Sequence, residues 1–373
     1  MGFGAVRTTS IASPPSHLIL AIRPPMESSN RRLSDIIPVA HLLLAALLSG
    51  RCAGAATSGA NGSSALHVLL AYGNTTANTA GQSRGCRPNH PARVHRGVLG
   101  FQRFDHLRCL AIATVALLPR PHPAVAIGAG VQQETMLMLG GVSPTVPGTA
   151  PGTEPTSFAA LARNVDPDLG RSVAEALGPD SNLPFDELVE QMDVQYHGFL
   201  ADPFENLRMM QVAFERMSRE HATRVHLIGY ALSNVTTSLR MPFGKGVSGS
   251  TFNQPAGSLG LGFSVPAEDI ASVMARVMRF SNAQRLFLLE INCEGCEYIL
   301  LPRLLSLGPE TVSRIDLITV QYHGHKRHHS VPSGFEIIKC KVERCLKETH
   351  IPLMLLDFTW EIWVSRMLLS SPI

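Results

Sequence analysis

The sequence predicts an α/β protein in which residues 156–373 form a doubly wound, mostly parallel sheet. From about residue 194 onward, short apolar runs alternate with stretches of helical periodicity, as in proteins that alternate strands and helices. The runs 285–291 and 315–322 are almost entirely apolar, which is typical of strands buried on both faces. Ligands of such sheets bind beyond the carboxyl ends of the strands, so polar residues at these ends are the candidates for function.

The first elements of this half are a strand and a helix. Residues 194–201 form a short aliphatic and aromatic run that ends in the turn signal Asp202-Pro203. A helix is expected over 204–219, because its large apolar residues recur at helical spacing. They share one helical face: Phe204, Leu207, Met210, Phe214 and Met217. The next strand is expected at 224–233.

The remaining elements alternate in the same way. Residues 244–262 are rich in Gly, Ser and Pro and are expected to be a loop or a pair of edge strands. Ser264, Pro266, Glu268 and Asp269 form a helix-start signature ahead of an apolar periodic stretch. Further helices are expected from residue 296 and over 334–347. Residues 352–358 and 360–365 are consistent with a terminal strand pair, in which Trp360 and Trp363 are packing residues.

The N-terminal region, residues 1–155, is predicted to be disordered or to serve in targeting. Residues 1–150 hold twelve Arg, no Lys and four acids, a net charge of +8, whereas the rest of the chain carries a net charge of −5. Stretches such as 81–91 and 140–155 consist mostly of residues that break regular structure. The apolar run 107–118 is interpreted as having no special role.

One part of this region has the layout of a secretory signal. Residues 26–56 contain Arg31 and Arg32, the apolar run 36–48 and a small-residue exit. The first hypothesis is therefore a signal sequence, with the secretory pathway (Golgi or secreted) as the location. A weak membrane anchor through 36–48 and an organelle transit peptide are the alternatives. Nucleic acid is not an expected partner, because the basic excess lies outside the folded half.

Two strand ends carry polar residues that could serve a site. Asp202 follows the second strand, where a carboxylate can accept hydrogen bonds from both ribose hydroxyls, or it can cap the following helix. The second strand end reads Glu290-Ile-Asn292-Cys-Glu294-Gly-Cys-Glu297. Its acids are expected to be exposed, since buried charges are costly without partners. Glu294 and Glu297 could orient a substrate or act as a base, or they could favour the start of the following helix.

One histidine and four cysteines are further candidates for a site. His323 follows the strand 315–322 and is a candidate acid–base residue. No metal site is expected. Cys293 and Cys296 together with Cys340 and Cys345 could supply four thiolates for zinc, but chance spacing or a single disulfide is the simpler interpretation.

These strand ends resemble those of FkbM-like S-adenosylmethionine-dependent methyltransferases. The segment 292–297, Asn-Cys-Glu-Gly-Cys-Glu, is similar to the family's Asp-x-Glu-Gly-x-Glu motif, with Asn292 in place of Asp. Asp202-Pro203 resembles the family's Glu-Pro, and residues 231–233 its Ala-Val-Ser. The segment 265–270 resembles a strand that leads into Thr-Leu-Asp, and 315–323 a strand that ends in Glu-x-His, with Gln321 in place of Glu.

The resemblance implies a Rossmann-like class I methyltransferase fold and S-adenosyl-L-methionine as the cofactor. It implies that Asp202 binds the cofactor ribose, that residues near Ala231 flank the adenine, and that Asn292 and Glu294 lie near the methionine end and the acceptor. The implied reaction is methylation of a hydroxyl on a small-molecule or glycan acceptor, which is oriented for in-line attack. Glu294 or Glu297 would take the proton.

The chain departs from the family at the glycine-rich loop after the first strand. The family pattern there is Asp-x-Gly-x-Asn-x-Gly, and it is expected 20–30 residues before Asp202, near 177–194. Only Gly178, Asp180 and Asn182 partly fit it, and prolines interrupt them. The alternative hypothesis is therefore a methyltransferase-like fold that has lost catalysis and serves as a binding or scaffold module.

Overall fold

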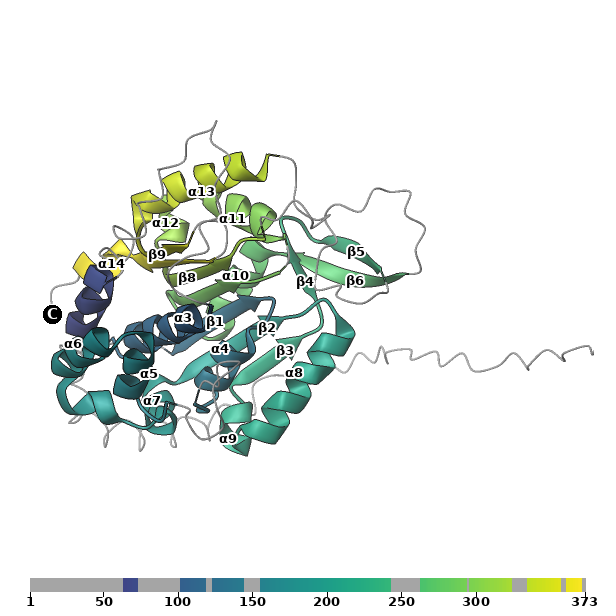
Figure 1. Cartoon of the computed structure of the whole chain (residues 1–373). Coiled ribbons are helices and arrows are strands. Elements are labelled where there is room, and N and C mark those ends of the chain that lie inside the picture. Colours follow the sequence, from purple (N-terminus) through teal and green to yellow (C-terminus); the bar gives the residue numbers. More distant parts are fainter. Residues whose placement is uncertain are drawn as a thin grey trace, which may run out of the picture. The chain divides into compact units, whose positions relative to one another are not determined.

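A seven-stranded sheet forms the centre of the protein, which is seen here as a computed structural model (Figure 1). The structure describes residues 63–72, 101–118, 123–143, 155–242, 262–293, 295–323, 334–356 and 360–370. All of them belong to one compact unit, Ala53–Ile373. The expected signal sequence at 26–56, with its apolar run 36–48, lies outside the described residues.

Five neighbouring strands of this sheet are parallel. In spatial order they are β3 (Val225–Ile228), β2 (Val194–Phe199), β1 (Ala124–Ala129), β7 (Leu286–Ile291) and β8 (Ile315–Gln321). Beside β8 lie β10 (Trp360–Ser365) and then β9 (His350–Leu356), and β10 is antiparallel to both of its neighbours. The mostly parallel α/β sheet is therefore confirmed, together with the terminal strand pair.

The middle strand, β1, comes from the region for which disorder was predicted. All six of its residues are buried, and it lies between α3 (Phe101–Ala116) and α4 (Gln133–Leu139). The prediction of disorder for 1–155 is thus wrong for 101–118 and 123–143, and also for the helical residues 63–72, whose Leu66 and Leu69 are fully buried. The strand, Ala-Val-Ala-Ile-Gly-Ala, contains mainly small side chains, so it lacks the large apolar signal that marks β7 and β8.

The segment in which the first strand was expected folds as helix instead. Between β1 and β2 the chain forms α5 (Phe158–Val165), α6 (Pro167–Leu177), the 3₁₀ helix η1 (Gly178–Asn182) and α7 (Phe185–Met192). Side chains cap the first two helices. Ser157 Oγ accepts from the N–H of Ala160, and Asp166 Oδ1 accepts from the N–H groups of Asp168 and Leu169. Most of residues 177–192 are therefore helical, and they lead into β2.

The predicted helix after β2 is present as α8 (Pro203–Arg216), but its large apolar face lies in solvent. Phe204, Leu207, Met210 and Phe214 are 71%, 63%, 51% and 86% exposed. The helix buries Asn206, Met209 and Ala213 instead. Both sets repeat at helical spacing, so the periodicity alone could not tell which face packs on the sheet.

A second, smaller sheet and the remaining helices complete the fold. After α9 (Arg219–Ala222) and β3, the strands β4 (Ala231–Ser233), β5 (Thr237–Pro242) and β6 (Gly262–Asp269) form a three-stranded sheet in the order β4-β6-β5. The helices that follow are α10 (Ile270–Phe280), α11 (Glu297–Leu305), α12 (Pro309–Val312), α13 (Phe335–Thr349) and α14 (Arg366–Ser370). The expected helix is present and α10 begins directly after Asp269, but residues 264–268 of the predicted start signature belong to the strand β6.

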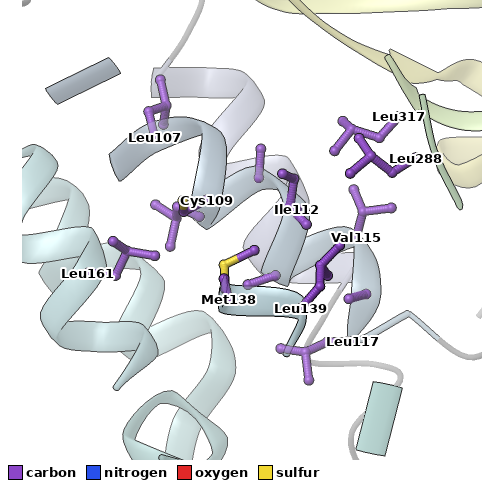
Figure 2. Close-up of a cluster of buried hydrophobic side chains, with 14 of the residues drawn as sticks. Leu107, Cys109, Ile112, Val115, Leu117, Met138, Leu139, Leu161, Leu288 and Leu317 are labelled. Carbon is purple, nitrogen blue, oxygen red and sulfur yellow. The ribbon is translucent and has the colours of Figure 1, made fainter. Parts of the chain in front are cut away.

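Apolar side chains cover both faces of the large sheet. Figure 2 shows Leu107, Ile112 and Val115 of α3 on the side where Leu288 and Leu317 project from β7 and β8. On the other face, α10, α11 and α13 contribute a second cluster that includes Ile270, Leu300 and Val342. Helices therefore lie on both faces, as in a doubly wound sheet. Among the described helices, none has both the length and the apolar character to cross a bilayer.

Candidate functional site

The ends of β1, β2 and β7 meet at one edge of the sheet, which we call the carboxyl edge. The N–H of Gly130 donates to the carbonyl of Phe199 at 3.0 Å, and the N–H of Asn292 donates to the carbonyl of Ala129 at 2.8 Å. These bonds extend the pairing of the three strands by one residue past their ends. The chain order reverses here, because β2 and β7 lie on opposite sides of β1, and such a switch point is the usual ligand position in an open α/β sheet.

Gly130 is the residue that allows the close approach at this edge. Its φ is +76°, and a Cβ atom built there would lie 1.7 Å from the carbonyl oxygen of Asn292. Only glycine fits this position without moving the backbone. Sequence reasoning missed it because residues 124–130 had been assigned to the disordered region. The available signal was a short apolar run that ends in Gly128-Ala-Gly130.

Asp202 lies just past the end of β2 and caps α8. Its Oδ1 accepts hydrogen bonds from the N–H groups of Phe204, at 2.8 Å, and Glu205, at 3.3 Å. The capping role considered for this residue is therefore confirmed. Among the described residues, no hydrogen-bond donor contacts the second carboxylate oxygen, Oδ2.

Ala231 lies next to this edge at the start of β4, separated from β3 by Gly229 and Tyr230. It pairs with Ala267 of β6 and is half-buried. Tyr230 beside it is 39% exposed. An aromatic ring and a small side chain thus follow the third strand, where sequence reasoning named only Ala231.

Asn292, which follows β7, is half-buried and is joined to β1 through its backbone. Glu294 lies outside the described residues, as do His325, His328 and His329. The structure therefore brings Asp202, Ala231 and Asn292 toward the carboxyl edge. It does not bring Gly178 and Asp180 there, because η1 contacts α5 and α6 and leads through α7 to the opposite, amino end of β2.

Glu297 and His323 are brought together by the ends of β7 and β8. Oε1 of Glu297 accepts from the backbone N–H of His323 at 2.8 Å and lies 3.2 Å from its Nδ1. Oε2 accepts from the N–H of Gly295 at 2.8 Å. Glu297 is fully buried and His323 is 9% exposed. The expected exposure of these acids is thus wrong for Glu297, since three donors compensate its burial.

Glu290 is also fully buried, beneath the carboxyl edge, and it belongs to a group that we call the Arg108 cluster. Its Oε1 accepts from Arg108 Nη1 at 3.2 Å and from Thr135 Oγ1 at 2.7 Å, and its Oε2 accepts from Tyr196 Oη at 3.3 Å. Arg108 Nη2 also lies 3.5 Å from the carboxylates of Asp105 and Glu134.

Burial dominates the electrostatics of this cluster. It raises the pKa of Glu290 to about 7, although the Arg108 charge acts in the opposite direction. It also raises the pKa of Asp105. The cluster connects α3 and α4 to β7 directly below Asn292, so it fixes the base of the edge. Sequence reasoning missed it, yet an arginine inside the apolar run 107–118 was a signal for a buried partner.

Two cysteines flank the turn that joins β7 to α11. Cys293 and Cys296 form a disulfide, and Cys340 is disulfide-bonded as well, so the chain has more than the single bridge expected from its sequence. Within the described ranges, no three His, Cys, Asp or Glu side chains gather closely enough to hold a metal ion.

The geometry therefore offers a ligand position at the switch point, one carboxylate beside it and a buried Glu–His pair near it. Comparison of the whole chain with known proteins finds no matching family model, no similar curated protein and no similar solved structure.

Proposed function

We propose that this protein is an S-adenosylmethionine-dependent methyltransferase that acts on a hydroxyl group of a small-molecule or glycan acceptor. The observation that carries the proposal is the meeting of Gly130, Asp202 and Asn292 at the switch point of the sheet. The doubly wound, mostly parallel sheet supports it further, because the resemblance implies a Rossmann-like class I methyltransferase fold.

In this proposal, residues at the ends of β1, β2, β3 and β7 would hold the cofactor, which would supply the methyl group. The backbone at Gly130 comes close to the cofactor, since no side chain stands in the way. Oδ2 of Asp202 would accept hydrogen bonds from the ribose hydroxyls while Oδ1 continues to cap α8. Tyr230 and Ala231, which follow β3, flank the adenine. Asn292 faces the methionine end.

The acceptor hydroxyl loses its proton to His323 in this scheme, and not to Glu297. Both oxygens of Glu297 already accept hydrogen bonds in the protein interior, so its role is to orient the imidazole through Nδ1. A base held by a second group in this way is a recurrent arrangement in catalysis. The attack on the methyl group then depends mainly on the alignment of the two reactants.

A second candidate, a binding module that has lost catalysis, is favoured by the sequence of the first strand. When the family pattern Asp-x-Gly-x-Asn-x-Gly is laid on residues 126–132, only Gly128 matches. Ala126, Gly130 and Gln132 stand in place of Asp, Asn and the second Gly. The chain therefore lacks an acid that could contact the cofactor from β1.

The proposal is tested by calorimetry with S-adenosylmethionine on the full chain. Asp202→Asn removes the charge but keeps a side chain that caps helices well. Asp166→Asn is the matched control, because Asp166 caps α6 by the same geometry. We expect saturable binding by the wild type and the control, and at least tenfold weaker binding by Asp202→Asn.

The absence of binding by the folded wild-type chain would overturn the proposal. Binding without methyl transfer to any hydroxylated acceptor would favour the second candidate. Transfer that is lost in His323→Gln, with cofactor binding unchanged, would support the role of His323 as the base.

A further inference from the structure

The turn between β7 and α11 has the features of a thiol–disulfide exchange site. Cys293 and Cys296 form a disulfide with a Cα–Cα distance of 5.4 Å, and two residues separate them along the chain. Cys296 is the N-cap residue of the nine-residue helix α11 and is 3% exposed, whereas Cys293 is half-buried. Cys293 is thus the more accessible cysteine of the pair, and the buried Cys296 lies at a helix N-terminus.

The surroundings of the pair favour a thiolate at the helix start. The first N–H groups of a helix carry partial positive charge, which stabilises a negative sulfur, and two residues between the cysteines are typical of redox-active pairs. A second, independent feature is the buried carboxylate of Glu297. Its Oε2 lies 3.9 Å from Cys293 Sγ, so its negative charge opposes a thiolate at Cys293 and favours the thiolate at Cys296.

A purely structural role explains this bridge poorly. A disulfide stabilises a protein mainly by constraining its unfolded chain, and the effect is smallest when the bridge closes a short loop. The loop here is only four residues long, Cys293 to Cys296. The hydrogen bonds of Glu297 to Gly295 and His323 already hold the same turn to the end of β8.

We propose that Cys293 and Cys296 form a redox-active disulfide that exchanges with a dithiol. This inference does not depend on the proposed methyltransferase function. A thiolate of the dithiol attacks Cys293 Sγ, a mixed disulfide forms, and the Cys293–Cys296 bond breaks with Cys296 leaving as the thiolate. The second thiol of the dithiol then attacks the dithiol sulfur that is bonded to Cys293. This step closes the disulfide of the oxidised dithiol and releases Cys293 as the thiolate. The protein disulfide is reduced to two thiols, and the dithiol is oxidised to a disulfide.

The sequence permits a direct measurement of this pair. Trypsin cleaves after Arg285 and Arg303, so both cysteines fall in one peptide, 286–303, which contains no other cysteine. The full-length native chain is equilibrated in buffers of graded reduced and oxidised dithiothreitol or glutathione. It is then quenched with acid, alkylated and analysed by mass spectrometry.

We expect the peptide to convert completely and reversibly between the disulfide form and the doubly alkylated form, while the far-UV circular dichroism stays constant. A disulfide that resists reduction until denaturant is added would overturn the proposal. So would a pair that stays reduced in oxidised glutathione.

Single substitutions test which sulfur is attacked. In Cys296→Ser, the remaining Cys293 is expected to form a mixed disulfide with oxidised glutathione at least tenfold faster than Cys345 of the same chain. Cys345 is the internal control, since it is a free, half-buried cysteine inside α13 and away from the start of that helix. In Cys293→Ser, the buried Cys296 is expected to react at least tenfold more slowly than Cys293 does. Equal rates for Cys293, Cys296 and Cys345 would contradict the assignment.

Discussion

The protein contains two buried charge clusters, one with α3 and one with α13, and they differ in how far apart their partners lie along the chain. In the Arg108 cluster, the bond from Arg108 to Glu290 joins residues 182 positions apart. In the second, which we call the Lys339 cluster, Lys339 bonds to Glu343 four positions away and to Glu361 22 positions away. Each cluster places one cation among buried or nearly buried carboxylates.

Both clusters pair a buried cation with carboxylates, but they connect different parts of the fold. The Lys339 cluster connects α13 to β10, two elements that are close in the chain. The Arg108 cluster connects α3 to α4 and to the middle of the sheet, so it makes the segment before residue 119 part of the fold. A guanidinium with several donors suits contacts to three separate carboxylates better than a single ammonium does.

The largest expected effect is the loss of the Arg108 cation. Arg108→Leu leaves Glu290 buried without its positive partner, which should lower the free energy of unfolding by about 3–5 kcal/mol. The double variant Arg108→Leu with Glu290→Leu should recover part of this loss, because no buried charge remains unpaired while the buried hydroxyls of Thr135 and Tyr196 lose their acceptor. Urea unfolding at pH 8 measures both. A loss below about 1 kcal/mol in the single variant would show that the cluster does not hold α3.

The next effect concerns pH. Burial raises the pKa of both Glu290 and Glu361 from 4.5 to about 7. Between these values the folded protein keeps a proton on each acid that the unfolded chain has lost. The stabilisation is therefore full below pH 4.5 and disappears as pH rises toward 7. Relative to Glu290→Gln or Glu361→Gln, the wild type should lose about 3 kcal/mol over this window, and a difference that does not vary with pH would contradict the prediction.

The two tryptophans of the chain allow a pH titration to follow each cluster separately, because one tryptophan contacts each cluster. Trp363 donates its indole N–H to Glu361 at 2.8 Å, whereas the ring of Trp360 lies 5.1 Å from the Arg108 guanidinium carbon. In Trp360→Phe, the fluorescence of Trp363 should change with a midpoint near pH 7, because the bonded carboxylate titrates. In Trp363→Phe, the change should be smaller, since Arg108 stays charged. Equal changes in the two variants would mean that the clusters respond together.

The smallest effect is expected at the rim of the Arg108 cluster. The side chain of Asp105 is 21% exposed and lies 3.5 Å from Arg108, but burial raises its pKa, so its charge gains little from the fold and Asp105→Asn should change the free energy of unfolding by less than about 0.5 kcal/mol. Glu343→Gln should cost more, because Glu343 bonds directly to a Lys339 ammonium that is 5% exposed. Thermal unfolding of the two variants at one pH compares them. The reverse order would mean that exposure does not decide the strength of these pairs.

The sequence predicted the second half of the sheet far better than its centre. β7, β8 and β10 contain large apolar residues that announce a buried strand, and all three were predicted close to their observed bounds. β1 consists mainly of Ala, Gly and Val, and its burial comes from neighbours that arrive much later in the chain. Without the position of β1, the glycine at the carboxyl edge could not be found, and Gly178 and Asp180 were named in its place.

For the candidate site, the residue types at strand ends predicted where the site residues lie, but not how deeply they are buried or what they contact. Asp202, Asn292 and His323 lie beside the strand ends at which they were expected. The burial of Glu290 and Glu297 could not be predicted, because it depends on Arg108, Thr135 and the backbone of His323, which only the folded chain brings near them. A buried acid can be predicted from sequence only when the position of its hydrogen-bond or charge partner in the fold is known.

The position of β1 has a consequence for the synthesis of the protein. Ala126 of β1 pairs with Leu288 of β7 on one side and with Tyr196 of β2 on the other. The ribosome makes both of these strands after β1. When α3 and β1 leave the ribosome, neither adjoining strand has been made. The apolar surfaces of α3 and β1 are therefore not fully covered until more than half of the remaining chain has been synthesised. Contacts of such long range slow folding and prolong the exposure of aggregation-prone segments. During translation, this chain should therefore depend on chaperones until β7 has emerged.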